Sequence, residues 1–350
     1  MTPPARPRLS IIIATYRRAD DLDRCIRSVL AEPGEDFDVL IGDDGSPDHT
    51  PEVIARHAAD PRVRSYRNER NLGMQENYWK IVHEATGDYL FILTDDDVLL
   101  PGALARVRAV LDAHPDTGYL LSDLPTVDER TGAEVDLHRT YDRDIVIPPG
   151  IAGVAHVARS AWVLSRQVFR REWLDWATWE RNRSNIFFQI IAAGRLLLTA
   201  PGYYIADRLV LHTWFNRVHW EKFGRDRTEI EFNLAADRYG CMAAILHDRA
   251  GDPAAAAAIT AWQAASLRAY LERPYDGFYD LLRLLGPGAA LRKLAAACPL
   301  GPAERRELLH FAVRLPAART TVAAGAILRR LVPSLAAEVR GLRSRLGRRT

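Results

Sequence analysis

The first 120 residues alternate strand-like and helix-like patterns, and this alternation restricts the fold more than any other feature. The strand-like runs are LSIIIA (9–14), FDVLIG (37–42), RVRSYR (62–67), DYLFIL (88–93) and GYLLS (118–122). In the first helix-like stretch the residues with helical spacing are Leu22, Cys25, Ile26, Val29 and Leu30. Strand and helix in alternation predict a mostly parallel sheet with helices on both faces. In such α/β sheets ligands bind beyond the carboxyl ends of the strands.

The rest of the chain follows other patterns. Residues 124–147 are polar and predict a hairpin with a turn at Thr131-Gly132, and six of the eight tryptophans lie between 162 and 220. From about residue 226 the sequence is helical in pattern and rich in alanine. We therefore expect a first domain over 1–225, with halves 9–122 and 123–225, and a helical, basic C-terminal region over 226–350.

Composition excludes several classes of protein. The chain has 350 residues, of which 48% are hydrophobic and 26% charged, which is typical of a globular protein with a large core. The three cysteines, Cys25, Cys241 and Cys298, are widely spaced, so neither a disulfide framework nor a zinc knuckle is predicted. No signal peptide or membrane-spanning run is visible. We expect a cytoplasmic protein that contacts a membrane only peripherally.

The net charge of +2 conceals an asymmetry along the chain. Residues 281–350 contain 14 Arg and Lys but only 3 Glu, whereas the preceding residues are acidic overall. In the tail, Leu335, Val339, Leu342 and Leu346 share one helical face and arginines fill the rest. Such a helix is typical of a surface for anionic lipid at the inner face of a membrane. It is equally typical of a solvated helix packed on its own domain, and without interleaved aromatic residues it does not favour nucleic acid.

Two acidic clusters indicate chemistry, each at the carboxyl end of a predicted strand. Asp43-Asp44-Gly45-Ser46 follows FDVLIG, and Asp95-Asp96-Asp97 follows DYLFIL. Crowded carboxylates repel one another unless a positive group lies among them, and a divalent cation with phosphate oxygens meets that need. Oxygen ligands favour Mg²⁺ or Mn²⁺ over zinc. Either cluster alone is also typical of a solvated turn, but both at equivalent strand ends favour a cation and phosphate site.

These residues resemble the family 2 glycosyltransferases, which adopt the GT-A fold. The segments that carry the resemblance, in the family's order and spacing, are LSIIIATYRRADDLDRCIRSVL, DVLIGDDGSPDHT, NLGMQENYWKIVHEATGDYLFILTDDDVLLPGAL and GYLLSD. The match is tight over 9–122 and extends loosely to about residue 215. It implies a Rossmann-like, mostly parallel sheet flanked by helices, followed here by the helical C-terminal region.

The resemblance also implies where a nucleoside-diphosphate sugar binds. Tyr16 and the backbone of Ala14 and Thr15 would border the nucleotide base, and Asp44, next to Asp43, would accept a hydrogen bond from that base. Further residues that it places along the same cleft are Asn71, Gly73 and Asn77.

The acidic triad has implied roles of its own. Asp95 would lie near the ribose and diphosphate, and Asp96 would hold a metal ion, Mn²⁺ or Mg²⁺, that bridges the two phosphates. Asp97 would be a second carboxylate on the metal or sugar side. His212 would lie near the diphosphate as a further metal ligand, or it is a hydrogen-bonded structural residue. Cleavage of the donor develops negative charge on the departing phosphate, and a bound dication stabilises that charge.

The chain departs from the family where the catalytic base is expected. An inverting transfer needs a carboxylate that takes a proton from the acceptor hydroxyl. Family members usually carry an acidic pair before a helix, and the matching residues 181–186 lack it. Glu180 lies nearest and Asp175 next, while Asp123 follows another strand that ends at the same cleft. Glu180 is equally explained as a solvated charge beside its arginine neighbours.

We expect metal-dependent transfer of a glycosyl group from a nucleoside-diphosphate sugar to a hydroxyl acceptor, with inversion. The expected setting is the biosynthesis of cell-surface glycans, polysaccharides or glycosylated natural products. UDP is the expected nucleotide, with dTDP and GDP open, and the acceptor is a glycan, a lipid-linked hydroxyl or a small molecule. Because the acidic pair is missing, the alternative is a non-catalytic or hydrolysis-only nucleotide-sugar-binding protein. A dinucleotide-dependent oxidoreductase would need GxGxxG where this chain has ATYRRADD.

A tryptophan stripe supplies a further candidate. Trp173, Trp176 and Trp179 recur every three residues. Aromatic faces stack on sugars, but tryptophans at helical spacing also pack in cores. The stripe is therefore interpreted either as part of the acceptor site or as packing.

Overall fold

The computed structural model describes residues 7–128, 133–135, 140–161, 163–214, 237–249 and 251–272. The chain divides into two compact units, Met1–His219 with Ala244–Asp248, and Trp220–Ala243 with Arg249–Thr350. Features predicted above that lie outside the described residues are the Thr131-Gly132 turn, Trp162, Trp220, the domain boundary at 225 and the basic tail from 281.

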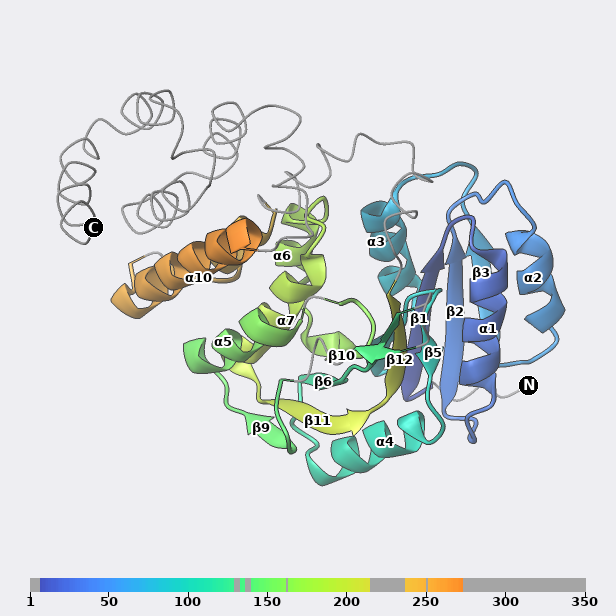
Figure 1. Cartoon of the computed structure of the whole chain (residues 1–350), viewed down its shortest axis with the longest axis horizontal. Helices are drawn as coiled ribbons and strands as arrows, with labels where there is room; N and C mark the ends of the chain where they lie inside the picture. The colour runs from blue at the N-terminus through green and yellow to red at the C-terminus, as the bar shows by residue number, and fades with distance from the viewer. Residues whose placement is uncertain are drawn as a thin grey trace, which may run out of the picture. The chain divides into compact units, whose positions relative to one another are not determined.

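An eight-stranded sheet forms the centre of the first unit (Figure 1). In spatial order its strands are β3 (Val63–Arg67), β2 (Phe37–Asp43), β1 (Leu9–Thr15), β4 (Tyr89–Ile92), β10 (Gln167–Arg170), β6 (Tyr119–Asp123), β11 (Gly202–Arg208) and β9 (Ile145–Ile147). Parallel pairs are β1 with β2 and β4, β2 with β3, and β6 with β11. β10 runs antiparallel between β4 and β6, and β9 is antiparallel to β11. The predicted mostly parallel sheet is confirmed.

Helices cover both faces of this sheet because side chains alternate between the faces along each strand. One buried cluster joins Ile11, Ile13 and Val39 to α1 (Ala19–Leu30), α2 (Thr50–His57) and α4 (Ala103–Ala113). On the other face α3 (Met74–Glu84) packs on β1 and β2, and α7 (Phe188–Thr199) packs on β6. α5 (Ile151–Ser160) and α6 (Trp176–Arg181) pack on α7. α1 confirms the helix predicted from the spacing of Leu22, Cys25, Ile26, Val29 and Leu30.

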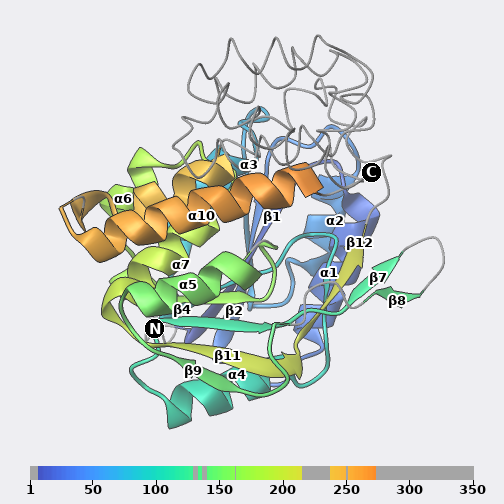
Figure 2. The ribbon, with the colours of Figure 1, turned by 60° about the vertical axis from the view of Figure 1, so that its left-hand side comes forward.

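A second, smaller sheet has the order β5 (Val98–Leu99), β12 (Val210–Trp214), β7 (Thr126–Asp128) and β8 (Glu134–Val135). β7 and β8 are antiparallel, as the predicted hairpin requires, and Figure 2 shows them extending away from the larger sheet. β12 pairs with β5, which directly follows the acidic triad. This pairing carries His212 to the end of β4. The remaining elements are η1 (Arg171–Trp173), η2 (His247–Arg249) and α10 (Pro253–Glu272).

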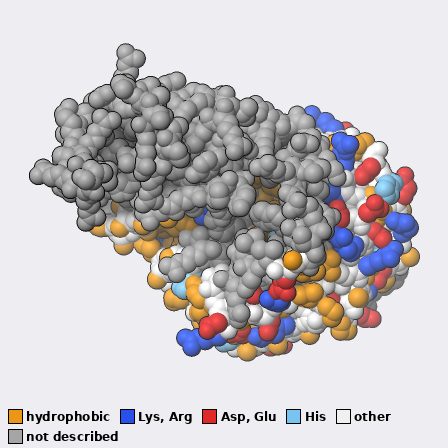
Figure 3. All heavy atoms as spheres, viewed as in Figure 1, with side chains coloured by type: hydrophobic (Ala, Val, Ile, Leu, Met, Phe, Trp, Pro, Cys, Tyr) orange, Lys and Arg blue, Asp and Glu red, His pale blue; other side chains and the backbone are white. Residues whose placement is uncertain are grey.

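The charged surface beside α1 and α2 consists of small groups of ion pairs. Asp23 lies 2.7 Å from an Arg27 nitrogen, 2.8 Å from His57 Nε2 and 3.7 Å from an Arg56 nitrogen. Figure 3 shows acidic and basic side chains interspersed over the visible described surface. Pairs of this kind each contribute up to about 1 kcal/mol. The acidic charge of this part of the chain is therefore balanced locally at the surface.

Gly87 allows the loop before β4 to lie against β1. A Cβ at this position would lie 2.6 Å from Ser10 N and 3.0 Å from the Leu9 carbonyl carbon, both backbone atoms. We predict that Gly87→Ala lowers the free energy of unfolding by about 1–3 kcal/mol, because the backbone has to shift to admit the methyl group. Denaturant unfolding measures the change.

The matched control is Gly240→Ala, where an added Cβ meets no atom within 4 Å and the backbone is helical. This substitution should leave stability unchanged or raise it. Equal stability of the two variants would contradict the argument from close approach.

Candidate active site

One edge of the large sheet gathers most of the candidate residues. Thr15, at the end of β1, lies opposite Asp43, at the end of β2, in a parallel register. The next strand, β4, is followed by the acidic triad, and β6 ends at Asp123. Because parallel strands end on the same side, residues distant in sequence meet at this edge. Ala14 and Tyr16 flank Thr15, and both are half-buried.

Asp95 is a buried carboxylate held by β1 and the start of α1. Thr15 Oγ1 donates a hydrogen bond of 2.7 Å to Asp95 Oδ2, and Arg18 Nη1 lies 3.1 Å from Asp95 Oδ1. The residue is 5% exposed. Burial raises the pKa of Asp95 to about 7, although Arg18 opposes the shift. The ionised form of Asp95 is therefore disfavoured in the folded protein even with Arg18 close by.

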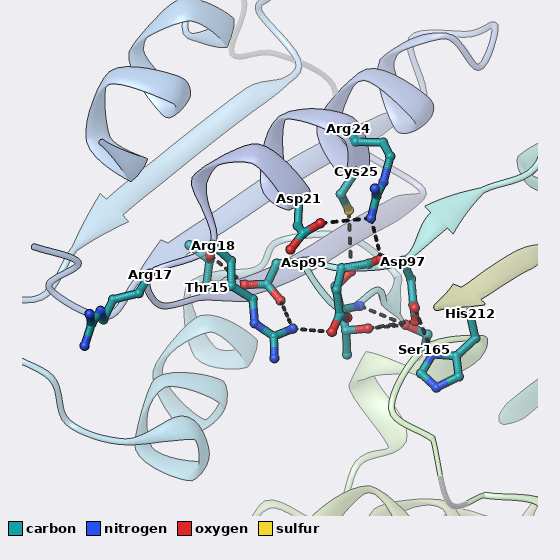
Figure 4. Close-up of polar contacts among 12 residues, drawn as sticks. Thr15, Arg17, Arg18, Asp21, Arg24, Cys25, Asp95, Asp97, Ser165 and His212 are labelled. Atoms are coloured by element: carbon teal, nitrogen blue, oxygen red, sulfur yellow. Dashed lines mark hydrogen bonds and ion pairs between the residues drawn. The ribbon is translucent and has the colours of Figure 1, made fainter. Parts of the chain in front are cut away.

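Asp96 lies against the same arginine. Its Oδ2 forms a short contact with Arg18 Nη1, and its backbone oxygen accepts a hydrogen bond of 3.2 Å from Arg24 Nη2 (Figure 4). Burial raises the pKa of Asp96, and the neighbouring Asp97 raises it further. Arg18, just before α1, and Arg24, within α1, thus approach the triad.

Asp97 forms a separate pair with His212. The carboxylate accepts hydrogen bonds from His212 Nδ1 at 2.8 Å and from Thr94 Oγ1 at 2.7 Å. Burial on its own raises the pKa of Asp97, but His212, Ser165 and Thr94 together outweigh it and lower the pKa. The same contact raises the pKa of His212, against the effect of its burial. Thr94, Asp97 and His212 form one polar group on the side of the triad that faces β12.

Asp44 organises the other acidic cluster. Its carboxylate accepts hydrogen bonds of 2.9 Å from Asn68 Nδ2, Leu72 N and Gly73 N. Gly73 has a φ of 93°, which favours glycine, and its N also donates to Asn71 Oδ1 at 2.8 Å. Asp44 thereby anchors the loop that leads into α3.

The start of α3 is tied to β2 by a second amide. Asn77 Nδ2 donates to the Gly42 carbonyl at 2.8 Å, and Asn77 Oδ1 accepts from Tyr66 Oη at 3.0 Å. Asp43 Oδ1 accepts from Ser46 N at 3.0 Å and so fixes the turn after β2. The structure thus brings Asp43, Asp44, Gly73 and Asn77 together, as expected from the sequence.

The three candidate bases lie apart from one another. Asp175 caps α6 by accepting from Thr178 N at 2.9 Å, and it pairs with Arg195 at 2.8 Å. Asp123 is buried and accepts from Tyr204 Oη at 3.3 Å. Glu180 is exposed, and within the described residues its carboxylate has no hydrogen bond or ion pair. Between described residues, no hydrogen bond or ion pair joins Glu180 or Asp175 to the acidic triad.

The tryptophans of α6 are packed. Trp176 and Trp179 stack at 5.9 Å between ring centroids, and both contact Trp79 of α3. Trp179 also stacks on Phe188 at 5.2 Å. Trp173 is 39% exposed and lies under the guanidinium of Arg170 at 3.8 Å. Packing therefore accounts for Trp176 and Trp179 in this structure.

Two arginines at this edge were not predicted from the sequence. Arg18 contacts both Asp95 and Asp96, and Arg166 is buried in the turn before β10, where Nη1 donates to the Ser122 carbonyl at 2.8 Å. Arg166 has a φ of 77°, which is rare for a residue other than glycine. Arg17 and Arg18 look alike in YRRADD, so only the backbone decides which of them turns inward.

The side chains of the triad are of a type that binds a hard cation. In this structure, however, they are not arranged around one cation position. The buried carboxylate oxygens of the triad are ligands that Mg²⁺ and Mn²⁺ prefer. Among the described residues, however, no three His, Cys, Asp or Glu side chains are arranged to hold a metal ion. Asp97 and His212 bind each other, and Arg18 lies on Asp96. By its chemistry Asp96 is a suitable cation ligand, but its Oδ2 is in contact with Arg18 in this structure.

Comparison with known proteins agrees with this geometry. Residues 10–171 match the family model described as "Glycosyl transferase family 2". The chain carries a domain of this family. Its sheet, with flanking helices, is that of the GT-A glycosyltransferases.

Among relatives of the family 2 domain, the succinoglycan biosynthesis protein ExoO of Rhizobium meliloti is 35% identical over 116 residues, which are 32% of this chain and 33% of ExoO. The GalNAc(5)-diNAcBac-PP-undecaprenol beta-1,3-glucosyltransferase of Campylobacter jejuni is 32% identical over 103 residues, 29% of this chain and 33% of that protein. The chain thus spans about a third of the length of these curated relatives.

Two solved structures share the fold over most of their length. Staphylococcus aureus TarS 1–349 in complex with UDP has a TM-score of 0.60 at 17% identity, covering 92% of this chain and 88% of that one. The mannosyltransferase PcManGT of Pyrobaculum calidifontis, in complex with GDP-Man and Mn²⁺, has a TM-score of 0.51 at 17% identity, covering 93% and 86%. At this identity the likeness establishes the fold.

The raised pKa of Asp95 predicts a pH dependence of stability without metal. The pKa is raised from about 3.8 to about 7, so the folded state binds the proton more tightly than the unfolded state. The free energy of unfolding should therefore fall as pH rises from about 4 to about 7, by at most about 4 kcal/mol for this group. Denaturant unfolding at several pH values measures the slope.

Asp95→Asn removes the titrating group, so the free energy of unfolding of this variant should change much less between about pH 4 and about pH 7. The control Asp116→Asn changes an exposed carboxylate and should retain the slope of the unmodified protein. An unchanged slope in Asp95→Asn would show that other groups produce the dependence.

Proposed function

We propose that this protein transfers a glycosyl group from a nucleoside-diphosphate sugar to a hydroxyl acceptor, with the help of Mn²⁺ or Mg²⁺. The observation that carries the proposal is the position of the buried triad Asp95–Asp97 beside Asp44 at one edge of a GT-A sheet. This arrangement offers a site for a nucleotide base next to a site for a cation and a diphosphate. The family 2 match over 10–171 supports the same reaction class.

Asp44 is proposed to accept a hydrogen bond from the nucleotide base. Its Oδ2 receives one N–H from the described residues, that of Gly73, and each carboxylate oxygen has two lone pairs. Tyr16 and the backbone of Ala14 and Thr15 would border the base. UDP is the proposed nucleotide, with dTDP and GDP as alternatives, and solved structures with this fold include complexes with UDP, UDP-GlcNAc and GDP-Man.

The triad is proposed to serve the diphosphate. Asp96 would hold the cation, and Asp95 would lie near the ribose and the diphosphate. When bound, the cation supplies Lewis acidity that stabilises negative charge on the departing phosphate. Asp97 holds His212 in place and keeps its imidazole at the same edge.

Glu180 is the proposed base for an inverting transfer. It is the exposed carboxylate of the three candidates, whereas Asp175 is a helix cap paired with Arg195 and Asp123 is buried under Tyr204. An accessible carboxylate is able to take the proton of an incoming hydroxyl.

The proposed acceptor is a glycan, a lipid-linked hydroxyl or a small molecule, in the biosynthesis of a cell-surface glycan, polysaccharide or glycosylated natural product. One relative is named for succinoglycan biosynthesis, and the name of another includes an undecaprenol diphosphate. Within the described part of the chain, no helix has the length and apolarity needed to cross a bilayer. A cytoplasmic protein that meets the membrane peripherally, through the basic tail, is proposed.

Donor binding tests the proposal directly. We predict that the protein binds one of UDP, dTDP or GDP in the presence of Mn²⁺ and hydrolyses or transfers the matching sugar. Asp96→Asn should lower the rate about a hundredfold or more, because charge stabilisation at the diphosphate is lost. Calorimetry and product analysis over a donor panel measure both.

The control Asp116→Asn makes the same chemical change at an exposed position and should leave both readings unchanged. Failure to bind every nucleotide sugar, with Asp96→Asn indistinguishable from the unmodified protein, would refute the proposed reaction.

A separate measurement addresses the base. Glu180→Gln should abolish transfer to the acceptor while donor affinity stays within about twofold, because the amide cannot accept the proton. Glu172→Gln, on an exposed glutamate that pairs with Arg170, is the matched control and should remain active. Near-normal turnover by Glu180→Gln would remove Glu180 from the mechanism.

A further inference from the structure

Arg18 bridges the two carboxylates that the proposed function assigns to the diphosphate and its cation. One guanidinium nitrogen, Nη1, lies 3.1 Å from Asp95 Oδ1 and also contacts Asp96 Oδ2 (Figure 4). The arginine side chain is 18% exposed, and those of Asp95 and Asp96 are 8% and 10% exposed. The contact is therefore a largely desolvated bridge between one cation and two anions.

The backbone directs Arg18, and not its neighbour, to this place. Arg18 immediately precedes α1, which is held by the buried side chains of Leu22 and Cys25. Arg17 has a φ of 58°, is exposed, and points away from the triad in Figure 4. Its backbone N donates to Ser46 Oγ at 3.0 Å, which fixes the turn. The bridge is thus a product of how β1 passes into α1.

Two buried carboxylates side by side need a positive partner, since desolvation and mutual repulsion otherwise disfavour their charges. Arg18 supplies that partner from within the chain. A cation that binds the Asp96 carboxylate comes close to the guanidinium that already contacts its Oδ2. The two positive charges repel each other, so the guanidinium and a divalent cation compete for this carboxylate.

We propose that Arg18 is an internal counterion that holds Asp95 and Asp96 in the donor-free protein and releases Asp96 when the cation arrives with the diphosphate. This inference rests on the proposed function. The diphosphate brings anionic oxygens that a released guanidinium can bind, so donor and cation together offset the lost bridge. The cation alone does not, and its affinity in the absence of nucleotide is low. Arg18 is in this sense a positioning residue that couples cation binding to donor binding.

Direct binding of Mn²⁺, followed by electron paramagnetic resonance on the full chain without acceptor, tests the coupling. Arg18→Gln should bind Mn²⁺ without nucleotide about ten- to a hundredfold more tightly than the unmodified protein, because a charge-assisted competitor is gone. Adding UDP or GDP should tighten Mn²⁺ binding strongly in the unmodified protein and much less in Arg18→Gln. Arg18→Lys, which keeps the charge but not the planar fork, should lie between the two.

Arg17→Gln is the matched control, since it removes one positive charge from the adjacent, outward-pointing residue and should behave like the unmodified protein. Equal Mn²⁺ affinity of Arg18→Gln and the unmodified protein without nucleotide would overturn the inference while leaving the proposed function intact. If Arg18→Gln does not fold, Arg18→Lys decides by the same comparison. Absence of Mn²⁺ binding in every variant, with either nucleotide present, would instead count against the cation of the proposed function itself.

Discussion

The burial of three consecutive carboxylates at the end of β4 is the constraint on which the rest of this site depends. Asp95, Asp96 and Asp97 are each less than 10% exposed, and burial disfavours their charged forms. Arg18 pairs with Asp95 and Asp96, and His212 pairs with Asp97. The compensation comes from inside the chain and is only partial, since the pKa values of Asp95 and Asp96 stay raised.

These compensating groups come from elements far apart in sequence, and the sheet order explains how they meet. β1 supplies Thr15 and the turn that presents Arg18, because it lies next to β4 in parallel. β12 supplies His212, since it pairs with the short strand that follows the triad. The antiparallel β10 fills the space between β4 and β6 and places Ser165 within 2.8 Å of Thr94 N. One row of strand ends thus receives residues from four parts of the chain.

Much of the fold and the meeting of the two acidic clusters at one edge of the sheet followed from the pattern of residues. Apolar runs such as 9–14 and 37–42 predicted buried parallel strands, and the acidic residues after them lie at one edge as expected. β10 was not predicted, because QVFR is four residues long and carries no alternation that separates it from its polar surroundings. Of the small sheet, the hairpin of β7 and β8 was expected, whereas the pairing of β5 with β12 was missed, because β5 has only two residues.

The sequence by itself determined the order of strands and helices and the presence of hard oxygen ligands at two strand ends, since periodicity and residue type are local properties. Only the tertiary structure decided the electrostatic partners of those ligands. Arg17 and Arg18 are chemically identical, and a backbone turn places one outside and the other on Asp95 and Asp96. Likewise His212 reaches Asp97 across 115 positions of sequence. Such pairings depend on the register between strands and on which side chains face inward once the helices are packed. The spacing of residues along the chain determines neither of these.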